Sequence, residues 1–200
     1  MPNRRRDKIA VLGGSGHARS VAETAQASGF DVVAFVIIEP GEEKGLDRPA
    51  VPSLEMLNLE DVGLAIGVGI NFQREALYKK VIATYPTVTF PVIAHPSAWI
   101  SSSAKLSPGS VIFAHASVAA KSEVGLCGLL NIGSSLDHDS TLGAFASLGP
   151  GARTGGNVTI GNRSMIGINA GILQRRQVGA DSVVGGHSLV NRNIGDLTVA

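Results

Sequence analysis

Aliphatic residues return at every sixth position along the second half of the chain, from Ile100 to Val190. An α-helix repeats near 3.6 residues and a half-buried strand repeats at about two, so a period of six matches neither element. The period is typical of a parallel β-helix, in which each hexad forms one face of a three-sided prism and its aliphatic residue points into the core. One position, Thr154, interrupts the series, which reads Ile100, Leu106, Ile112, Val118, Val124, Leu130, Leu136, Leu142, Leu148, Thr154, Ile160, Ile166, Ile172, Val178, Val184 and Val190.

The phase of this repeat predicts how the coils stack. Three hexads make one coil of 18 residues, so residues 18 positions apart lie directly above one another. Four positions after each aliphatic residue the chain has Ala, Ser, Gly or Val, except at Arg176 and Ile194. We expect left-handed coiling, which is known for this pattern although it departs from the usual right-handed crossover rule. Because no insertion interrupts the phase, an active site here must be built from faces and corners of the prism.

Before this repeat the hydrophobic pattern alternates between short β-branched runs and amphipathic helical runs. That order indicates a small parallel sheet with right-handed crossovers, a Rossmann-like arrangement. The expected fold is therefore α/β followed by all-β, with one domain at residues 1–94 and a left-handed parallel β-helix at residues 95–200. Strands are predicted at 8–13, 31–38, 63–69 and 88–93, and helices are predicted between His17 and a stop at Gly29, in a short stretch after Ser53, and at 74–85.

Composition supports this division and excludes several classes of protein. Hydrophobic residues make up 44% of the chain but aromatic residues only 4%, with 25 glycines, which suits a coil-stacked core of small aliphatic side chains. The net charge of +1 gives no case for binding nucleic acid or an acidic membrane, and Arg4, Arg5 and Arg6 are expected to form a solvated tail. Cys127 is the only cysteine, so we expect a buried thiol and neither an intrachain disulfide nor a Cys-rich zinc site. No signal-like or membrane-spanning apolar run occurs, which makes the cytoplasm the expected location.

Two glycine-rich turns are candidates for binding a ligand. The first, Gly13-Gly14-Ser15-Gly16-His17, follows a predicted strand and opens a predicted helix, so its N–H groups can approach a phosphate or sugar oxygen. Arg19 replaces the last glycine of the full dinucleotide motif, and a purely structural strand-to-helix turn remains the alternative. The second turn spans 67–71, and both turns follow strands of one parallel sheet, so they are expected to face one crevice. The candidate ligand-binding residues are Gly13, Ser15, Gly16, His17, Gly69 and Asn71, while Arg74 meets either a pyrophosphate or solvent.

The β-helix has one conspicuous polar break, at Asn131 and at Asp137-His138-Asp139. A histidine beside a carboxylate can act as a general base, because the carboxylate orients the ring and raises its basicity. The alternative is a polar exterior corner without chemistry. Three other histidines have weaker claims: His115 and His187 occupy the fourth place of their hexads, and His95 precedes a proline at the domain junction.

Together these features resemble bacterial sugar acyltransferases that join a Rossmann-like sugar-nucleotide domain to a hexapeptide left-handed β-helix. That group includes sialic acid O-acetyltransferases and the N-acetyltransferases of nucleotide-linked 4-amino-4,6-dideoxy sugars. The resemblance covers about residues 8 to 200. It rests on GGSGHA (13–18), GVGINFQR (67–74), N-x6-HD (131–139), PGARTGGNVTIG (150–161), IGINAGI (166–172) and VVGGHSLV (183–190).

The resemblance implies a direct attack of the sugar amine or hydroxyl on the thioester of acetyl-CoA, without a metal. His138 is then the general base, Asp139 raises its basicity, and Asn131 lines the acceptor pocket. Gly156, one coil above His138, lies where an N–H would stabilise the oxyanion. Family members are homotrimers with the active site between subunits. The implied cofactor-binding residues are Ser147, Gly156, Ile168 and Gly186.

The chain departs from the family pattern in four places. Ile37 and Ile38 stand where acidic residues usually hold the sugar nucleotide, and Ser147 replaces a second histidine. Residues 174–176, Gln-Arg-Arg, replace a turn that usually contains proline, and their arginines are placed to meet CoA phosphates. The sequence ends at Ala200, where relatives continue toward the adenine, which is expected to weaken CoA binding.

The leading prediction is thus an acetyl-CoA-dependent N-acetyltransferase acting on a nucleotide-linked 4-amino-4,6-dideoxy sugar in surface glycan biosynthesis. O-acetylation of a sialic-acid-like sugar would use the same base, so these residues leave amine and hydroxyl acceptors open. A non-enzymatic protein that binds sugar nucleotides is a further alternative. A γ-type carbonic anhydrase would need three zinc-binding histidines, and His115, His138 and His187 are too scattered for that.

Overall fold

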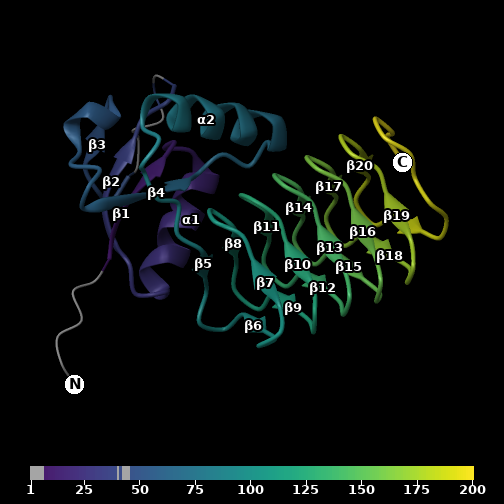
Figure 1. The fold of residues 1–200 in the computed structure, drawn as a ribbon. Helices are drawn as coiled ribbons and strands as arrows, with labels where there is room; N and C mark the ends of the chain where they lie inside the picture. Colours follow the sequence, from purple (N-terminus) through teal and green to yellow (C-terminus); the bar gives the residue numbers. More distant parts are fainter. Residues whose placement is uncertain (1–6, 40, 42–45) are drawn as a thin grey trace. The chain divides into compact units, whose positions relative to one another are not determined.

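The computed structural model describes residues 7–39, 41 and 46–200, and it divides into two compact units, Met1–Ile93 and Ala94–Ala200 (Figure 1). The predicted tail Arg4–Arg6 lies outside the described residues. Neither helix among the described residues combines the length and the apolar character needed to cross a bilayer.

The first unit is a four-stranded parallel sheet in the order β3-β2-β1-β4. The core of the sheet is the β-branched and aliphatic run of β1, flanked by Phe35 and Leu64, all fully buried. Figure 1 shows α1 and α2 on opposite sides of this sheet. The elements are β1 (Lys8–Leu12), α1 (Gly16–Ala27), β2 (Asp31–Val36), β3 (Ala50–Val51), η1 (Leu54–Met56), β4 (Val62–Ile66) and α2 (Asn71–Thr84).

The predicted strand at 88–93 is wrong except at its last residue, Ile93, which begins the two-residue strand β5 (Ile93–Ala94). Only one backbone bond, from the N–H of Leu64 to the carbonyl of Thr89 at 2.8 Å, joins this segment to β4. Pro91 has no N–H to donate, so the segment cannot continue as a ladder. The fourth strand of the sheet is instead β3, which pairs with the end of β2. The helix α2 also begins three residues earlier than predicted, at Asn71.

The second unit consists of two-residue strands that stack into three parallel sheets, one for each face of the prism (Figure 1). The sheets have the orders β19-β16-β13-β10-β7, β20-β17-β14-β11-β8-β5 and β21-β18-β15-β12-β9-β6. Partners are 18 residues apart, as in the pairing of Ser117 with Ser135. The strands are β5 (Ile93–Ala94), β6 (Trp99–Ile100), β7 (Lys105–Leu106), β8 (Val111–Ile112), β9 (Ser117–Val118), β10 (Glu123–Val124), β11 (Leu129–Leu130), β12 (Ser135–Leu136), β13 (Thr141–Leu142), β14 (Ser147–Leu148), β15 (Arg153–Thr154), β16 (Thr159–Ile160), β17 (Met165–Ile166), β18 (Gly171–Ile172), β19 (Gln177–Val178), β20 (Val183–Val184) and β21 (Leu189–Val190).

The six-residue series forms the core of this unit, with its members from Ile112 to Val190 buried. Three positions after each aliphatic residue the backbone adopts a positive φ, from Gly109 to His187, which turns the chain at each corner of the prism. Glycine occupies few of these corners, so the left-handed conformation is imposed by the stacked coils on residues that adopt it less readily. His115 and His187 are two such corner residues, and Cys127 is a third, with its thiol buried. The predicted fold class is confirmed.

Candidate functional site

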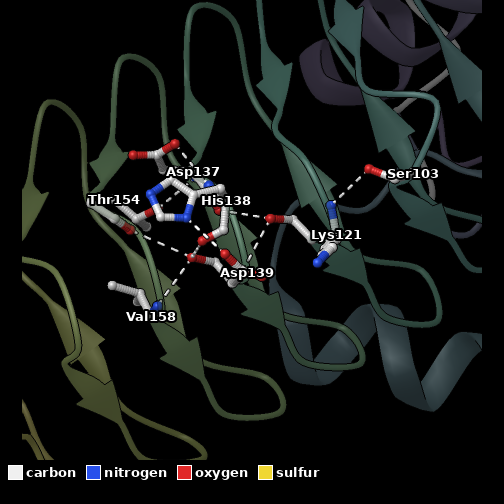
Figure 2. A network of polar contacts seen from close by, with 10 residues as sticks. Ser103, Lys121, Asp137, His138, Asp139, Thr154 and Val158 are labelled. Atoms are coloured by element: carbon white, nitrogen blue, oxygen red, sulfur yellow. Dashed lines mark hydrogen bonds and ion pairs between the residues drawn. The ribbon is translucent and has the colours of Figure 1, made fainter.

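The polar break in the β-helix forms a corner immediately after β12. Here the ring of His138 is exposed, and its Nδ1 lies 2.8 Å from Oδ2 of Asp139. Asp139 occupies the left-handed corner position, with φ of 55°, and this turn directs its carboxylate back to the neighbouring ring (Figure 2). Because an ionised carboxylate only accepts, Nδ1 carries the hydrogen and Nε2 of the neutral ring keeps its lone pair. The corner therefore presents a base at Nε2.

Two carboxylates raise the basicity of this ring. The hydrogen bond to Asp139 is the main cause that raises the pKa of His138 above its usual value, and the charge of Asp137 is the second. Oδ1 of Asp137 also accepts the backbone N–H of His138 at 2.8 Å. Asp137 is therefore part of the site, although the sequence prediction assigned it no role.

Hydrogen bonds from the coils above and below hold the backbone of this corner. The Ser122 hydroxyl donates to the carbonyl of Asp137 at 2.6 Å, and the N–H of Asn157 donates to the carbonyl of His138 at 2.9 Å. The N–H of Asp137 donates to the Thr154 hydroxyl at 2.9 Å (Figure 2). A corner whose backbone is held from both neighbouring coils keeps its side chains in a defined position.

Gly156 lies directly over the imidazole, as the 18-residue period predicts. A Cβ placed on Gly156 would collide with Cε1 and Nε2 of His138. Within the described chain its N–H donates to no other group. The glycine thus leaves room for the ring and presents a free backbone donor beside Nε2.

The two glycine-rich turns of the first unit adjoin at the carboxyl ends of β1 and β4. A Cβ on Gly13 would lie 3.4 Å from the carbonyl oxygen of Gly67, and a Cβ on Gly67 would meet the carbonyl oxygen of Leu12 at 2.9 Å. At the second turn, a Cβ on Gly69 would meet the ring of His17 at 3.5 Å. The expected common crevice is present, because a pocket of about 600 Å³ has both turns in its wall.

His17 is mostly buried in the wall of this pocket. Burial, with a smaller contribution from the positive charge of Arg74, lowers the pKa of His17 to about 4. Its ring is therefore neutral at physiological pH, and it offers the pocket a hydrogen-bonding group without a charge.

Comparisons with known proteins place the chain among bacterial sugar acetyltransferases. A family model described as the PglD N-terminal domain matches residues 8–81. A histidine-to-alanine variant of GDP-perosamine N-acetyltransferase from Caulobacter crescentus, in complex with CoA and GDP-perosamine, is 31% identical with a TM-score of 0.89, and the match covers 96% of this chain and 92% of that chain. The acetyltransferase domain of PglB from Neisseria gonorrhoeae, in complex with acetyl coenzyme A, is 32% identical with a TM-score of 0.87, and the match covers 95% of this chain and 93% of that chain.

The chain belongs to the hexapeptide-repeat family of bacterial sugar acetyltransferases. The predicted family and enzyme class are confirmed, and the expected co-substrate agrees with the CoA and acetyl-CoA present in those relatives. WeeI from Acinetobacter baumannii shares the same fold, with a TM-score of 0.83 at 20% identity over 96% of this chain and 95% of that chain.

In this acetyltransferase the other predicted cofactor and acceptor residues lie away from the His138 corner. Asn131 precedes β12 whereas His138 follows it, so the two residues occupy opposite edges of one prism face. Ile168 and Gly186 share the edge of Asn131, and a Cβ on Gly186 would meet Cγ2 of Ile168 at 2.9 Å. Ser147 is buried on β14, in a different face. A single prism therefore does not bring these residues to Nε2.

Both alternatives for Arg74 are wrong. The side chain is 2% exposed, and its guanidinium donates to the carbonyls of Val68 and Gly69 at 3.1 and 2.9 Å. It also donates to Oδ1 of Asn71 at 2.8 Å, and Asn71 is itself buried. Arg74 therefore fixes the second glycine turn and the start of α2, and the predicted ligand-binding residue Asn71 serves as one of its acceptors.

Sequence reasoning missed several residues in the wall of the pocket. Gln73, Leu77 and Lys80 lie along α2 with the spacing of one helix face, and that spacing was the available signal. Ile38 and Glu39 complete the wall after β2, whereas Gly13 and Gly16 are not in its lining. Among the residues that the structure describes, no three His, Cys, Asp or Glu side chains converge to hold a metal ion.

Proposed function

We propose that this acetyltransferase transfers the acetyl group of acetyl-CoA to the amino group of a nucleotide-linked 4-amino-4,6-dideoxy sugar. The observation that carries the proposal is the His138 corner, in which Asp139 holds Nδ1 and leaves Nε2 facing the backbone of Gly156. Support for the substrate class comes from the relative that was solved with CoA and GDP-perosamine. O-acetylation of a sialic-acid-like sugar is the alternative that the experiment below distinguishes.

His138 acts as the general base in this proposal. The amine nitrogen attacks the thioester carbonyl carbon while Nε2 takes one of its protons, and the carbonyl oxygen becomes an oxyanion. The N–H of Gly156 donates to that oxyanion. When the intermediate collapses, the carbon–sulfur bond breaks, and the thiolate of CoA receives the proton from Nε2. The products are an amide and CoA, and the ring returns to its neutral form.

The remaining predicted residues fit a site shared between subunits of a homotrimer. His138 lies on one edge of a prism face, and Asn131, Ile168 and Gly186 lie on the other edge. A site that uses both groups must therefore combine edges of neighbouring chains. In this arrangement Asn131 contacts the acceptor, while Ile168, Gly186 and the backbone near Ser147 contact the pantetheine arm.

The pocket of the first unit is the proposed site for the nucleotide-linked sugar. Ser15, His17 and Gly69 supply hydrogen-bonding groups at its wall, and Lys80 supplies a positive charge for a phosphate. Ile38 provides an apolar contact where the family usually places an acidic residue. Residues 1–94 then bind the sugar nucleotide, and residues 95–200 carry out the transfer.

The test is acetyl transfer by the purified chain from acetyl-CoA to UDP-, GDP- and dTDP-linked 4-amino-4,6-dideoxy sugars, with product mass as the readout. His138→Asn should reduce kcat by roughly a hundredfold or more, because the base contributes on that scale. His115→Asn removes another exposed histidine and is the matched control. Transfer to a sialic-acid-like hydroxyl but to no amino sugar would favour the O-acetyl alternative, and full activity in His138→Asn would reject the proposed base.

A further inference from the structure

The backbone ladder of the β-helix has one exception beside the catalytic corner. From Ile112 to Val190, the carbonyl of every residue in the six-residue series except Thr154 accepts the N–H of the residue 17 positions earlier. On the same face, for example, Leu136 accepts from Ala119 at 2.9 Å and Ile172 accepts from Gly155 at 2.8 Å. Within the described chain, the carbonyl of Thr154 accepts no hydrogen bond.

The Thr154 side chain explains the exception. The N–H of Asp137, which would continue the ladder, donates to the hydroxyl of Thr154 at 2.9 Å and leaves the Thr154 carbonyl without its donor. The pairing of β12 with β15 is accordingly limited to Ser135 and Arg153, whereas the neighbouring pairs on this face have two matched residues. An aliphatic residue has no hydroxyl to make this exchange. Thr154, the only non-aliphatic member of the series, therefore removes one backbone hydrogen bond between neighbouring coils.

The released carbonyl belongs to the coil that lies over the corner of the proposed base. Its usual donor immediately precedes His138 in the chain, and Figure 2 shows Thr154, Asp137 and His138 gathered at one corner. The two residues that follow Thr154 are glycines, so they add no side chain of their own next to this carbonyl. A buried carbonyl without a donor is costly, which makes it a ready acceptor for an N–H group of a ligand.

We infer that the Thr154 carbonyl accepts the second N–H of the sugar amine and thereby selects an amine over a hydroxyl acceptor; this inference rests on the proposed function. A primary amine that attacks the thioester has two hydrogens. His138 Nε2 removes one, and the Thr154 carbonyl accepts the other, which becomes a stronger donor as positive charge develops on nitrogen. The amide product keeps that hydrogen, so the bond persists until release.

A hydroxyl acceptor cannot make both contacts. Its single hydrogen goes to Nε2, and the oxygen lone pairs then face the oxygen of Thr154, which is repulsive. A site that leaves a buried acceptor unpaired with one substrate discriminates against that substrate. The carbonyl thus separates the two acceptor classes that the histidine and its carboxylates leave open.

The experiment compares kcat/KM for a nucleotide-linked 4-amino sugar with that for the same sugar carrying a hydroxyl at the reacting carbon. In Thr154→Val the N–H of Asp137 should donate to the carbonyl of residue 154, which is then no longer free for the substrate. The preference for the amine should therefore fall roughly tenfold, which corresponds to the loss of one hydrogen bond. The variant restores an aliphatic residue to the core, so thermal denaturation should show an unchanged or higher Tm. Thr154→Ser keeps a hydroxyl and should retain the preference, and Thr159→Val, on an exposed face, is the matched control.

The possible results separate the two proposals. An unchanged amine preference in Thr154→Val overturns the role of the carbonyl while acetyl transfer stands. A wild-type chain that acetylates the hydroxyl analogue as well as the amine also overturns it. Transfer to neither analogue by the wild-type chain instead rejects the proposed function, together with the selectivity that depends on it.

Discussion

The imidazole of His138 lies against the backbone of Gly156 so closely that any side chain on residue 156 would collide with the ring. The two residues are 18 positions apart, so the contact is a direct consequence of coil stacking. It places a backbone N–H next to the nitrogen proposed as the base. The glycine is therefore needed for space, and in the proposed mechanism its N–H is also needed as a donor.

Gly156→Ala should lower kcat by roughly a hundredfold, because the methyl group displaces the ring by about an ångström from its productive position. The protein should still fold, since the ring is at the surface and can move aside. Gly171→Ala, whose added Cβ would have only an ordinary contact at 3.4 Å with Leu189, is the control. Steady-state kinetics and thermal denaturation of both variants test this, and equal kcat values would contradict it.

Asp139→Asn should shift the pH dependence of the reaction. Because the proposed base His138 must be deprotonated to act, kcat/KM should rise with pH through its pKa, which the hydrogen bond to Asp139 and the charge of Asp137 hold above the usual value. A neutral amide weakens this effect, so the acidic limb should move to lower pH. The limiting rate should fall by roughly tenfold because the base is weaker. Asparagine tolerates the positive φ of residue 139, so the corner is preserved.

Asp181→Asn is the matched control for this experiment. Asp181 also occupies a left-handed corner, with φ of 55°, and its carboxylate pairs with Arg163 instead of a histidine. Its replacement should leave the acidic limb where it is in the wild-type chain. An acidic limb that stays in place in Asp139→Asn would show that Asp139 does not set the basicity of the catalytic group.

The sequence determined the β-helix more completely than it determined the first unit. Every coil repeats the same environment, so the period alone predicts that residues such as Ser117 and Ser135 pair and that Gly156 stacks over His138. The small sheet has no such repetition. Its short edge strand β3 has little pattern of its own, and the predicted strand at 88–93 failed at Pro91, a residue whose missing N–H was visible in the sequence.

In the two candidate sites, too, features that follow from the regular fold could be predicted, whereas individual side-chain contacts could not. The two glycine turns could be placed together because strands of a parallel sheet end on one side. The burial of Arg74 could not be predicted, because it depends on which carbonyls happen to lie within reach of its side chain. The break at Thr154 was visible in the sequence, but its consequence for the ladder required the hydrogen bond from Asp137.

His17 should make the stability of the first unit depend on pH. Burial lowers its pKa from 6.5 to about 4 in the folded chain, so the unfolded chain binds a proton at a pH where the folded chain does not. The free energy of unfolding is therefore highest above about pH 6.5. It falls by up to about 3 kcal/mol as the pH decreases toward 4. Urea unfolding of wild type and His17→Gln across this range should show the difference, with His115→Asn as the control for loss of a histidine. If the free energy of unfolding changed with pH in the same way in wild type and in His17→Gln, His17 would not be the source of the pH dependence.

Arg74→Met should destabilise the first unit by about 3 kcal/mol, because it leaves the buried acceptors at Val68, Gly69 and Asn71 without their donor. Lys79→Met, on the exposed side of the same helix, removes only a surface ion pair with Glu75 and should cost less than about 1 kcal/mol. Urea unfolding curves for the two variants provide the measurement.

Removing the charge of Arg74 should also affect His17, since that charge is the second cause of its lowered pKa. The pKa of His17 should rise in Arg74→Met, and the loss of stability between pH 6.5 and 4 should become smaller than in the wild-type chain. Binding of a nucleotide-linked sugar should weaken in parallel, because the turn at Gly69 forms part of the pocket wall. If Arg74→Met matched Lys79→Met in both stability and pH dependence, the guanidinium would not be what fixes the second glycine turn and the start of α2.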